Sequence, residues 1–531
     1  MAHAHIDPTT SPPKVEFPTP YNAGADLLER HLPALADKIA YRDDRVALSY
    51  AGLRERADRA GNALLALGLR PEERVLLMML DTVDFPAVFL GAIKAGLVPV
   101  PVNTLLTPAD YAYLLTDSRA RALIVSDHLV SLTGQAIVAA NLPASRVLVA
   151  DTSLGGPVHP YGLLADHLAA ASPQLSAART SPDDVAFWLY SSGSTGAPKG
   201  ALHLHSHLVQ TAALYAQGVL GMRPDDVVFS AAKLFFAYGL GNALTFPLAV
   251  GATAILMAER PTPAAVVRTL RTHVPTIFCG VPTLYASMLA SETAAPDGAS
   301  RNLRMSISAG EALPRHVGER WRARMGTDIL DGIGSTEMLH IFISNRPGDV
   351  RYGTSGRPVP GYDLDLRDDG GGPVGDDEEG ALWVRGPTAC VAYWNQRAKS
   401  LATFHGAWTR TGDRYTRDAD GYYTYSGRAD DMMKVGGIWV SPFEVESALA
   451  AHPAVLEAAV VAHGDIDGLV KPKAFVVLRE PTRAGVAMIN ELQAFVKQRL
   501  APFKYPRWIE FATELPKTAT GKIQRYRLRG I

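Results

Sequence analysis

One segment of the chain, residues 191–200, combines glycine, serine and threonine with a single lysine, in the order Ser-Ser-Gly-Ser-Thr-Gly-Ala-Pro-Lys-Gly. Apolar, β-prone residues precede it at 185–190 and follow it at 201–204, which predicts a loop held between two strands. Free backbone N–H groups, hydroxyls and Lys199 suit such a loop to a polyphosphate. It is not a Walker A loop, because proline precedes the lysine and glycine follows it. The proline and the lysine also depart from the composition of a flexible Gly/Ser linker.

The composition argues against several classes of protein. With 531 residues the chain exceeds the size of one simple core, which predicts at least two domains. A formal net charge of −1 gives no electrostatic footprint for nucleic acid or an anionic membrane surface. The longest apolar stretch, 243–258, contains a proline and a glycine and is too short to span a bilayer. Cys279 and Cys390 offer no disulfide framework or metal-knuckle spacing, which fits a reducing compartment. From the charge, the apolar stretches and the cysteines together, we expect a soluble, cytoplasmic protein without nucleic-acid or membrane partners.

The order of predicted elements indicates the fold class. Helical and β patterns alternate from residue 21 to about residue 346, which predicts βα units on largely parallel sheets. From 353 to 425, glycine and aspartate clusters punctuate short alternating segments, as in an antiparallel β subdomain. Ser441 and Pro442 then match the preferred first residues of a helix that opens a small α+β unit. We therefore expect an α/β multidomain protein with a flexible arm (1–20), an N-terminal domain (21–428), a hinge (429–434) and a mobile C-terminal domain (435–531).

Five short motifs carry the chemistry of the chain. They are the 191–200 loop; Asp-Gly-Ile-Gly-Ser-Thr-Glu at 331–337; Arg-Thr-Gly-Asp at 410–413; Gly-Arg-Ala-Asp-Asp at 427–431, followed by Lys434 and Gly436-Gly437; and Pro-Lys-Thr-Ala-Thr-Gly-Lys-Ile-Gln-Arg at 516–525. Alone, each has an ordinary structural explanation: a turn aspartate at 413, a helix N-terminal glutamate at 337, a solvated lysine at 522. Their order and spacing together are far more specific than any single motif.

In these five motifs the chain resembles the adenylate-forming superfamily, which includes acyl-CoA synthetases, peptide-synthetase adenylation domains and luciferases. The resemblance runs from about residue 25 to the C-terminus. It implies an enzyme that joins a carboxylate to the α-phosphate of ATP, releases pyrophosphate, and passes the acyl group to CoA with release of AMP. The implied cofactors and co-substrates are ATP, Mg²⁺ and coenzyme A. The sequence leaves a homodimer open.

The resemblance also implies roles for residues of the N-terminal domain. The β- and γ-phosphates would be held by Ser191, Ser192, Gly193, Ser194, Thr195, Gly196 and Lys199. The nucleotide would also contact Ala309, Gly310, Glu311, Asp331, Gly332, Ile333, Gly334 and Ser335. Thr336 is expected to contact the α-phosphate, and Glu337 to hold Mg²⁺. Asp413 is expected to accept both ribose hydroxyls, with Arg428 near the ribose and phosphate.

In the C-terminal domain, the resemblance implies that Lys522 stabilises the charge that develops during adenylation. The domain would then rotate about Asp430, carry Lys522 out of the site, and bring Gly436 and Gly437 in to line the CoA channel. Two glycines suit a backbone that approaches a narrow thiol arm closely. Because acetylation removes the charge of a lysine, Lys522 is also a candidate regulatory site.

Within the superfamily, the chain is most similar to bacterial benzoate-CoA ligases. The similarity lies in Lys-Leu-Phe-Phe-Ala-Tyr-Gly-Leu-Gly-Asn at 233–242, Gly-Val-Pro-Thr at 280–283 and Glu-Met-Leu-His at 337–340. It implies an acyl pocket lined by Ala237, Tyr238, Ala309, Gly334, Leu339, His340 and Ile341. Large residues would close its far end and small ones leave a slot about one ring thick. Shape must do most of the selecting, since an aromatic contact adds only about 1 kcal/mol.

Several alternatives stay open at this point. The acid could be 4-hydroxybenzoate, 2-aminobenzoate or a short fatty acid, and His340 could equally be a packing or supporting residue. A different class is an adenylation module that loads a carrier protein, although no carrier motif occurs in the 531 residues. A light-emitting oxygenase has no supporting peroxisomal address in Arg-Gly-Ile at 529–531. A non-catalytic AMP-binding protein would not need both Glu337 and Lys522.

A histidine-rich segment allows a further hypothesis. His203, His205 and His207 would share one face if the strand that begins near residue 201 continued through them. Three histidines on one face suggest a metal site. No fourth ligand is apparent in the sequence, and the resemblance implies a structural use of this stretch, so packing is the favoured interpretation.

Overall fold

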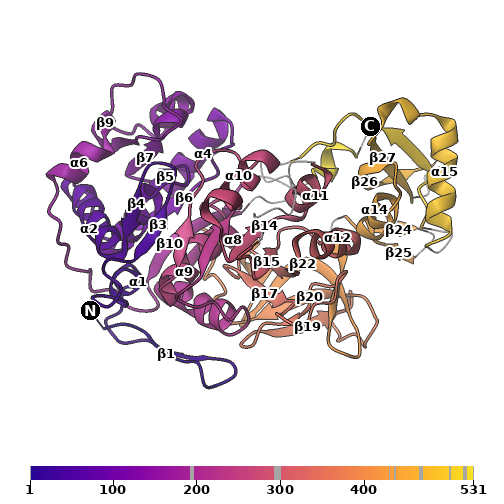
Figure 1. Cartoon of the computed structure of the whole chain (residues 1–531), viewed down its shortest axis with the longest axis horizontal. Coiled ribbons are helices and arrows are strands. Elements are labelled where there is room, and N and C mark those ends of the chain that lie inside the picture. The colour runs from indigo at the N-terminus through magenta and orange to yellow at the C-terminus, as the bar shows by residue number, and fades with distance from the viewer. Residues whose placement is uncertain are drawn as a thin grey trace.

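The computed structural model describes residues 2–191, 197–291, 301–429, 431–435, 438–465, 470–500, 504–517 and 523–529. A large N-terminal region holds most of the helices and strands, and a smaller C-terminal unit lies at one end of it (Figure 1). The N-terminal region contains two α/β sheets and an antiparallel β subdomain, which confirms the predicted α/β multidomain fold. Within these ranges, none of the helices has the length and apolar character that crossing a membrane requires.

The first α/β layer is a five-stranded parallel sheet with the strand order β6-β5-β7-β8-β9. Its strands are β5 (Arg74–Met78), β6 (Val98–Pro101), β7 (Ala122–Ser126), β8 (Val147–Ala150) and β9 (Gly162–Leu163). Its helices are α2 (Tyr50–Ala66), α3 (Asp84–Lys94), α4 (Pro108–Ser118), α5 (Gly134–Ala139) and α6 (Leu164–Ala170). Strands β5, β6 and β7 are almost wholly buried, which explains their continuous apolar runs.

The second layer is a nine-stranded sheet with the order β18-β17-β16-β15-β14-β12-β13-β3-β4. Neighbours from β16 to β3 run parallel, and the outer strands run antiparallel. Its strands are β3 (Ile39–Arg42), β4 (Ala47–Ser49), β12 (Val227–Ser230), β13 (Thr253–Ile255), β14 (Ile277–Gly280), β15 (Met305–Ser308), β16 (Ile329–Gly334), β17 (Ile341–Ser344) and β18 (Arg357–Pro358). Local sequence patterns do not reveal that β3, from the start of the chain, pairs with β13 from its middle.

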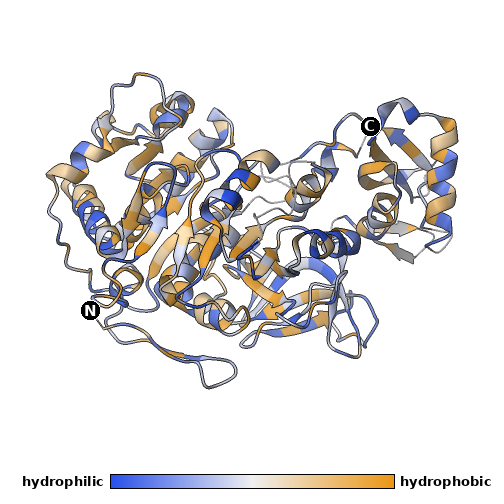
Figure 2. Cartoon of the chain, in the orientation of Figure 1, coloured by the Kyte–Doolittle hydropathy of each residue, from blue (hydrophilic) through white to orange (hydrophobic). Residues whose placement is uncertain are grey.

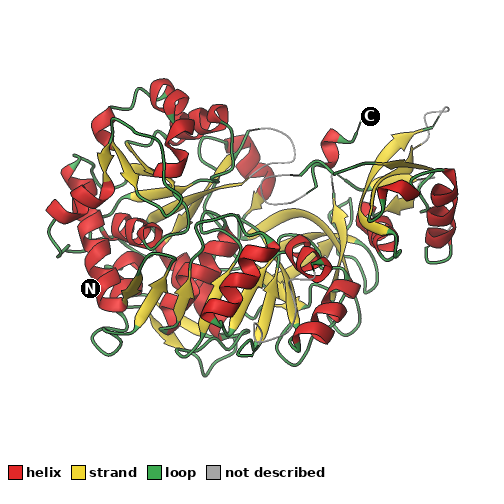
Figure 3. Ribbon diagram, turned by 45° about the horizontal axis from the view of Figure 1, so that its top comes forward, coloured by secondary structure: helices red, strands yellow, loops and turns green. Residues whose placement is uncertain are grey.

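The helices of this part of the chain follow the strands closely. They are α1 (Ala23–Glu29), α7 (His205–Thr211), α8 (Ala237–Leu240), α9 (Phe246–Val250), α10 (Pro263–His273), α11 (Pro282–Ala290) and α12 (Arg315–Met325), with π-helical turns η3 (Ala212–Gln217) and η4 (Gly241–Thr245). Thr262 caps α10 by accepting from the N–H of Ala265. Helices cover both faces of the α/β sheets (Figure 3), and apolar residues concentrate on the strands between them (Figure 2).

A separate two-stranded sheet follows the first α/β layer in the sequence. Strands β10 (Val185–Ser191) and β11 (Lys199–Leu204) pair antiparallel, so the glycine- and serine-rich segment connects two paired strands as predicted. An antiparallel subdomain comes after the last strand of the second layer. It contains β19 (Asp363–Arg367), β20 (Gly380–Arg385), α13 (Arg397–Thr403), β21 (Phe404–His405), β22 (Trp408–Arg417) and β23 (Tyr423–Arg428).

The C-terminal unit is α+β, as expected. It contains β24 (Met433–Val435), β25 (Ile438–Val440), α14 (Pro442–Ala450), β26 (Val455–Gly464), β27 (Val470–Leu478), α15 (Val486–Lys497) and β28 (Trp508–Phe511). Ser441 caps α14 by accepting from the N–H of Glu444, which confirms the predicted helix start. Strand β24 begins inside the predicted hinge (429–434), and the domain boundaries stay predictions.

The N-terminal segment, predicted to be a flexible arm (1–20), contains a short hairpin, and its flexibility stays a prediction. Strands β1 (His5–Asp7) and β2 (Lys14–Glu16) pair as an antiparallel hairpin. The N–H of Ala4 donates to Asp26 at 3.0 Å, which attaches the segment to α1. Asp26 is buried, and a bond to a buried carboxylate fixes the segment more firmly than its proline-rich composition suggests.

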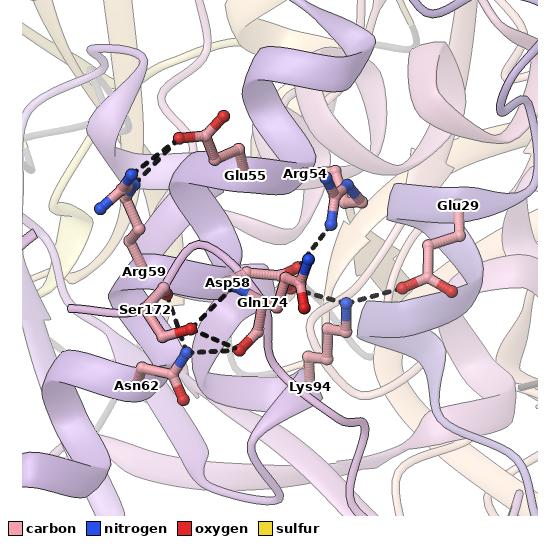
Figure 4. A network of polar contacts seen from close by, with 9 residues as sticks. All are labelled: Glu29, Arg54, Glu55, Asp58, Arg59, Asn62, Lys94, Ser172 and Gln174. Carbon is pink, nitrogen blue, oxygen red and sulfur yellow. Dashed lines mark hydrogen bonds and ion pairs between the residues drawn. The ribbon is translucent and has the colours of Figure 1, made fainter.

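A buried polar network joins the first three helices (Figure 4). Lys94 on α3 lies 2.6 Å from both Asp58 on α2 and Glu29 on α1, and Arg54 lies 2.9 Å from Asp58. Burial raises the pKa of Asp58 even though Lys94 opposes that shift. Loss of one partner would leave an unpaired buried charge, so the network fixes how the three helices pack.

Candidate active site

Several predicted site residues lie outside the described residues. They are Ser192, Gly193, Ser194, Thr195, Gly196, Asp430, Gly436, Gly437 and Lys522. The roles implied for them stay predictions. The described site residues fall into a charged group and a mostly apolar group, and the turn between β16 and β17 contributes to both.

The charged group, which we call the phosphate cluster, consists of Ser191, Lys199, Glu337 and Tyr393. Ser191 ends β10 directly opposite Lys199, which begins β11. The Tyr393 hydroxyl donates to Glu337 Oε1 at 2.6 Å, and Ser191 Oγ donates to the same oxygen at 3.3 Å. Lys199 Nζ donates to the Tyr393 hydroxyl at 3.3 Å and lies 4.3 Å from the centre of its ring. A cation, a carboxylate and two hydroxyls therefore meet where the sequence predicts phosphate binding.

The protonation states in the phosphate cluster follow from burial and charge. Burial lowers the pKa of Lys199, and the Glu337 carboxylate partly offsets this shift. Burial and the same carboxylate raise the pKa of Tyr393, so the phenol keeps its proton. Tyr393 is absent from the predicted site, because it lies in the apolar sequence Val-Ala-Tyr-Trp, which resembles ordinary core.

Asp413 and Arg428 form a second charged pair, on facing positions of the β22–β23 ladder. Arg428 Nη1 lies 3.1 Å from Asp413 Oδ1 and donates to the carbonyl of Thr411 at 3.2 Å. Asp413 raises the pKa of Arg428 above its ordinary value. Gly412, directly before Asp413, has a φ of 77°, in the left-handed region that favours glycine, and a Cβ there would lie 3.0 Å from Arg428 Nη2. The arginine thus fixes the orientation of the carboxylate.

The two segments that contain the other predicted nucleotide contacts lie side by side. Ser308 at the end of β15 pairs in register with Asp331 on β16, so residues 309–311 leave the sheet beside residues 331–335. Burial raises the pKa of Asp331 to about 8. Its backbone carbonyl accepts from the N–H of Asn345 at 2.9 Å, and Glu311 accepts from Thr283 Oγ1 at 2.8 Å.

The mostly apolar group, which we call the acyl cluster, consists of His340, Tyr215, Tyr238 and Phe246. The His340 ring centre lies 4.5 Å from that of Phe246, 5.4 Å from that of Tyr215 and 5.7 Å from that of Tyr238. His340 Nε2 donates to the carbonyl of Tyr238 at 3.2 Å, and the Tyr238 hydroxyl donates to the carbonyl of Ile307 at 2.9 Å. Burial lowers the pKa of His340 to about 3, so its ring is uncharged at neutral pH.

Two glycines lie close to His340, and the predicted slot for the acid stays a prediction. A Cβ on Gly241 would lie 2.2 Å from His340 Cδ2, and one on Gly334 would lie 2.4 Å from the His340 carbonyl oxygen. Of the other predicted acyl residues, Ala237 begins α8, Ile341 begins β17 and Ala309 follows β15, while Leu339 has a φ of 67° in the turn before His340. Tyr215 and Phe246 were not predicted, because helical apolar spacing marks them only as core.

The three histidines near β11 do not share a strand face, because β11 ends at Leu204 and α7 begins at His205. His203 Nε2 donates to the carbonyl of Thr336 at 2.8 Å, and His205 Nδ1 accepts from the N–H of Ala23 at 3.0 Å. Burial lowers the pKa of both histidines to about 4. No group of three or more His, Cys, Asp or Glu side chains in the described ranges could hold a metal ion. His203 therefore supports the turn that contains Thr336, and His205 links α7 to α1.

The chain matches two family models. AMP-binding enzyme covers residues 28–394, and the AMP-binding enzyme C-terminal domain covers residues 444–522. A benzoate–CoA ligase from Thauera aromatica is 58% identical over 526 residues, 98% of each chain. A 4-hydroxybenzoate–CoA/benzoate–CoA ligase from Rhodopseudomonas palustris is 50% identical over 513 residues, 96% of this chain and 94% of that protein. A crystal structure of a benzoate CoA ligase from Burkholderia xenovorans LB400 superposes with a TM-score of 0.88 and 55% identity, covering 96% of this chain and 100% of that one.

Proposed function

The chain belongs to the AMP-binding enzyme family, and from this premise we propose that it is an ATP-dependent benzoate–CoA ligase. It joins benzoate to AMP, releases pyrophosphate, and then transfers the benzoyl group to the thiol of CoA with release of AMP. Similarity over nearly the whole chain supports the complete reaction, since both family models match in order. The observation that carries the choice of acid is the 58% identity to a benzoate–CoA ligase over 98% of each chain, and the acyl cluster, in which an uncharged His340 is packed among aromatic rings, is compatible with it.

The first half-reaction brings two anions together, so the site must neutralise charge and hold an in-line geometry. Lys199 provides a cation at the start of β11, and Ser191 provides a hydroxyl opposite it. We assign the β- and γ-phosphates to these residues and to the loop between them, and the α-phosphate to Thr336. The hydrogen bond from His203 Nε2 to the carbonyl of Thr336 supports the turn that contains Thr336.

Glu337 fits a magnesium ion that is bound together with ATP. Mg²⁺ in nucleotide sites uses one or two carboxylates and completes its coordination with phosphate oxygens and water. The described part of the chain offers one such carboxylate beside Lys199 and no larger cage of metal-binding side chains, which suits this arrangement. When bound, the ion would offset the negative charge of the phosphates.

The remaining nucleotide contacts follow from the second charged pair. Asp413, oriented by Arg428, would accept the two ribose hydroxyls. Residues 309–311 and 331–332 would edge the adenine from neighbouring segments of the sheet. This arrangement separates the recognition of the nucleoside from that of the phosphates.

The C-terminal residues complete the proposal. Lys522 would stabilise charge on the α-phosphate and carboxylate oxygens during adenylation. Rotation about Asp430 would then replace it with Gly436 and Gly437, beside which the pantetheine arm of CoA enters. Cys279 and Cys390 are buried free thiols, which supports a reducing cytoplasm as the location. We retain a homodimer as the candidate assembly.

The acyl cluster selects by shape and polarity. An uncharged His340 makes no ion pair with a carboxylate, so the flat ring of benzoate would be recognised by contact with Tyr238 and the small residues beside it. A ring hydroxyl would be penalised strongly only if it stayed unpaired. Since one relative is a ligase for both 4-hydroxybenzoate and benzoate, 4-hydroxybenzoate is the strongest alternative acid.

An AMP-release assay with CoA and a panel of acids tests the assignment. The panel contains benzoate, 4-hydroxybenzoate, 2-aminobenzoate and a short fatty acid. We expect benzoate to rank among the best two or three by kcat/KM. A higher rank for all the other acids would refute the benzoate assignment, and transfer to a carrier protein but not to CoA would place the enzyme in a different class.

A further inference from the structure

Tyr393 lies between the lysine and the carboxylate of the phosphate cluster, and the roles assigned above leave it unused. Its side chain is buried, with 4% of the residue exposed. An ammonium only donates and a carboxylate only accepts, so the phenol proton must point toward Glu337. The chain of hydrogen bonds therefore has one direction, from Lys199 through the Tyr393 hydroxyl to Glu337.

The backbone holds Tyr393 in place from two sides. The N–H of Trp394 donates to the carbonyl of Gly200 at 2.8 Å, beside Lys199 on β11. The N–H of Cys390 donates to the carbonyl of Glu337 at 2.7 Å. The segment that carries Tyr393 is thus attached both to the strand of the lysine and to the turn of the carboxylate.

The hydroxyl separates two groups of opposite charge. Without it, Lys199 and Glu337 would be left without their shared partner, and direct pairing between them would become the favourable arrangement. Such a pair would engage both the cation proposed for phosphate and the carboxylate proposed for Mg²⁺. The Tyr393 ring also faces the ammonium at 4.3 Å, which restrains Lys199 independently of the hydroxyl.

We propose that Tyr393 is a positioning residue for adenylation, whose hydroxyl keeps Lys199 and Glu337 apart and orients both toward magnesium-bound ATP. The proposal rests on the proposed function, because it takes those two residues as the ATP contacts. It predicts that the hydroxyl matters for nucleotide binding and not for the later thiol step.

The substitution Tyr393→Phe tests the role, because it removes the hydroxyl and keeps the ring. Calorimetry without acid or CoA should show about a 10-fold rise in the Kd of MgATP, the size expected for a hydrogen bond to a charged group. The turnover of supplied benzoyl-AMP with CoA should stay near that of the wild type. Phe404→Leu is the matched control, since Phe404 packs against the Tyr393 ring at 5.2 Å and leaves the hydroxyl in place; its Kd should stay within twofold of the wild type.

A double-mutant cycle separates positioning from packing. If Tyr393 acts through Glu337, the effect of Tyr393→Phe on the Kd should shrink in a Glu337→Gln background. Additive effects, an unchanged Kd in Tyr393→Phe, or a large drop in its melting temperature without nucleotide would each overturn the proposal. A wild-type protein that fails to bind MgATP would instead refute the proposed function, so the two failures are distinguishable.

Discussion

The phosphate cluster and the acyl cluster sit close together in the fold but differ in how they treat charge. In the phosphate cluster, Lys199 and Glu337 are only partly buried and are linked through a hydroxyl. In the acyl cluster, burial keeps His340 uncharged, and its Nε2 proton is given to a backbone carbonyl. The same turn after β16 supplies Glu337 to one cluster and His340 to the other.

We infer that the charged cluster activates the acid and that the neutral cluster selects it. Charged groups that are exposed enough to exchange partners can bind phosphates and Mg²⁺, whereas a neutral aromatic cluster discriminates mainly by shape. Changes in the charged region should therefore affect ATP and the adenylation rate. Changes in the acyl cluster should affect the choice of acid and leave ATP binding unchanged.

The largest effect is expected from Lys522→Ala, which removes the cation proposed to act on the reacting atoms. Adenylation should fall by about 10³-fold, the scale of losing an oxyanion-stabilising group. Conversion of supplied benzoyl-AMP to benzoyl-CoA should stay largely intact, because the proposed rotation would carry the lysine out of the site before that step. Pre-steady-state assays of each half-reaction measure both. Equal losses in the two steps would contradict a two-conformation cycle.

Asp413→Asn tests the proposed contact between Asp413 and the ribose of ATP. The substitution removes the charge that pairs with Arg428 and one of the acceptors proposed for the ribose. The KM for ATP should rise by roughly 10- to 100-fold, in line with the loss of charged hydrogen bonds. The KM for benzoate should change little. A change confined to the KM for benzoate would contradict the division between the two regions.

His340→Ala probes the acyl side. Removing the imidazole leaves space among Tyr215, Tyr238 and Phe246, so the catalytic efficiency with benzoate should fall by about 10-fold. Ring-substituted acids should lose less, or gain. The KM for ATP is the internal control and should remain unchanged. Identical losses for every acid would show that His340 only supports packing.

The smallest effect concerns acid stability. Burial lowers the folded-state pKa of His203 and His205 to about 4 and that of His340 to about 3, against about 6.5 when unfolded. Between those values the unfolded chain binds more protons, so this stabilisation is present above pH 6.5 and is lost as the pH falls toward 4. At pH 5.5 each histidine lowers the free energy of unfolding by about 1 kcal/mol, relative to its value above pH 6.5.

Melting curves between pH 7 and pH 5 measure this dependence. The melting temperature should fall with pH, and His205→Gln, which keeps an acceptor near the N–H of Ala23, should flatten the slope. Buried Asp331 acts in the opposite direction, because its raised pKa of about 8 removes stability as the pH rises. An unchanged slope in the variant would contradict a neutral, buried His205.

Much of the fold could be predicted from local sequence. The Ser-Pro start of α14 and the two strands that flank the glycine- and serine-rich segment match the structure. Pairing between distant segments could not be predicted, because periodicity describes which face is buried and not which partner covers it. The hairpin β1–β2 and the junction of β3 with β13 are of this kind.

Prediction of the candidate site from the sequence has the same limit as prediction of the fold. Glu337 and Asp413 were predicted through the family resemblance that the ordered motifs carry, since each residue alone has an ordinary structural explanation. Tyr393 was missed because its neighbours in sequence are apolar and its partners come from two other segments. Phe246 likewise approaches His340 only through the fold.

A crystal structure with bound benzoyl-AMP would locate the nucleotide and the benzoyl ring at the same time. We expect the ribose hydroxyls on Asp413, the phosphate beside Thr336, and the benzoyl ring against His340 and Tyr238. A benzoyl ring outside the acyl cluster, or a ribose away from Asp413, would contradict the division of the site into a charged half that activates and a neutral half that selects.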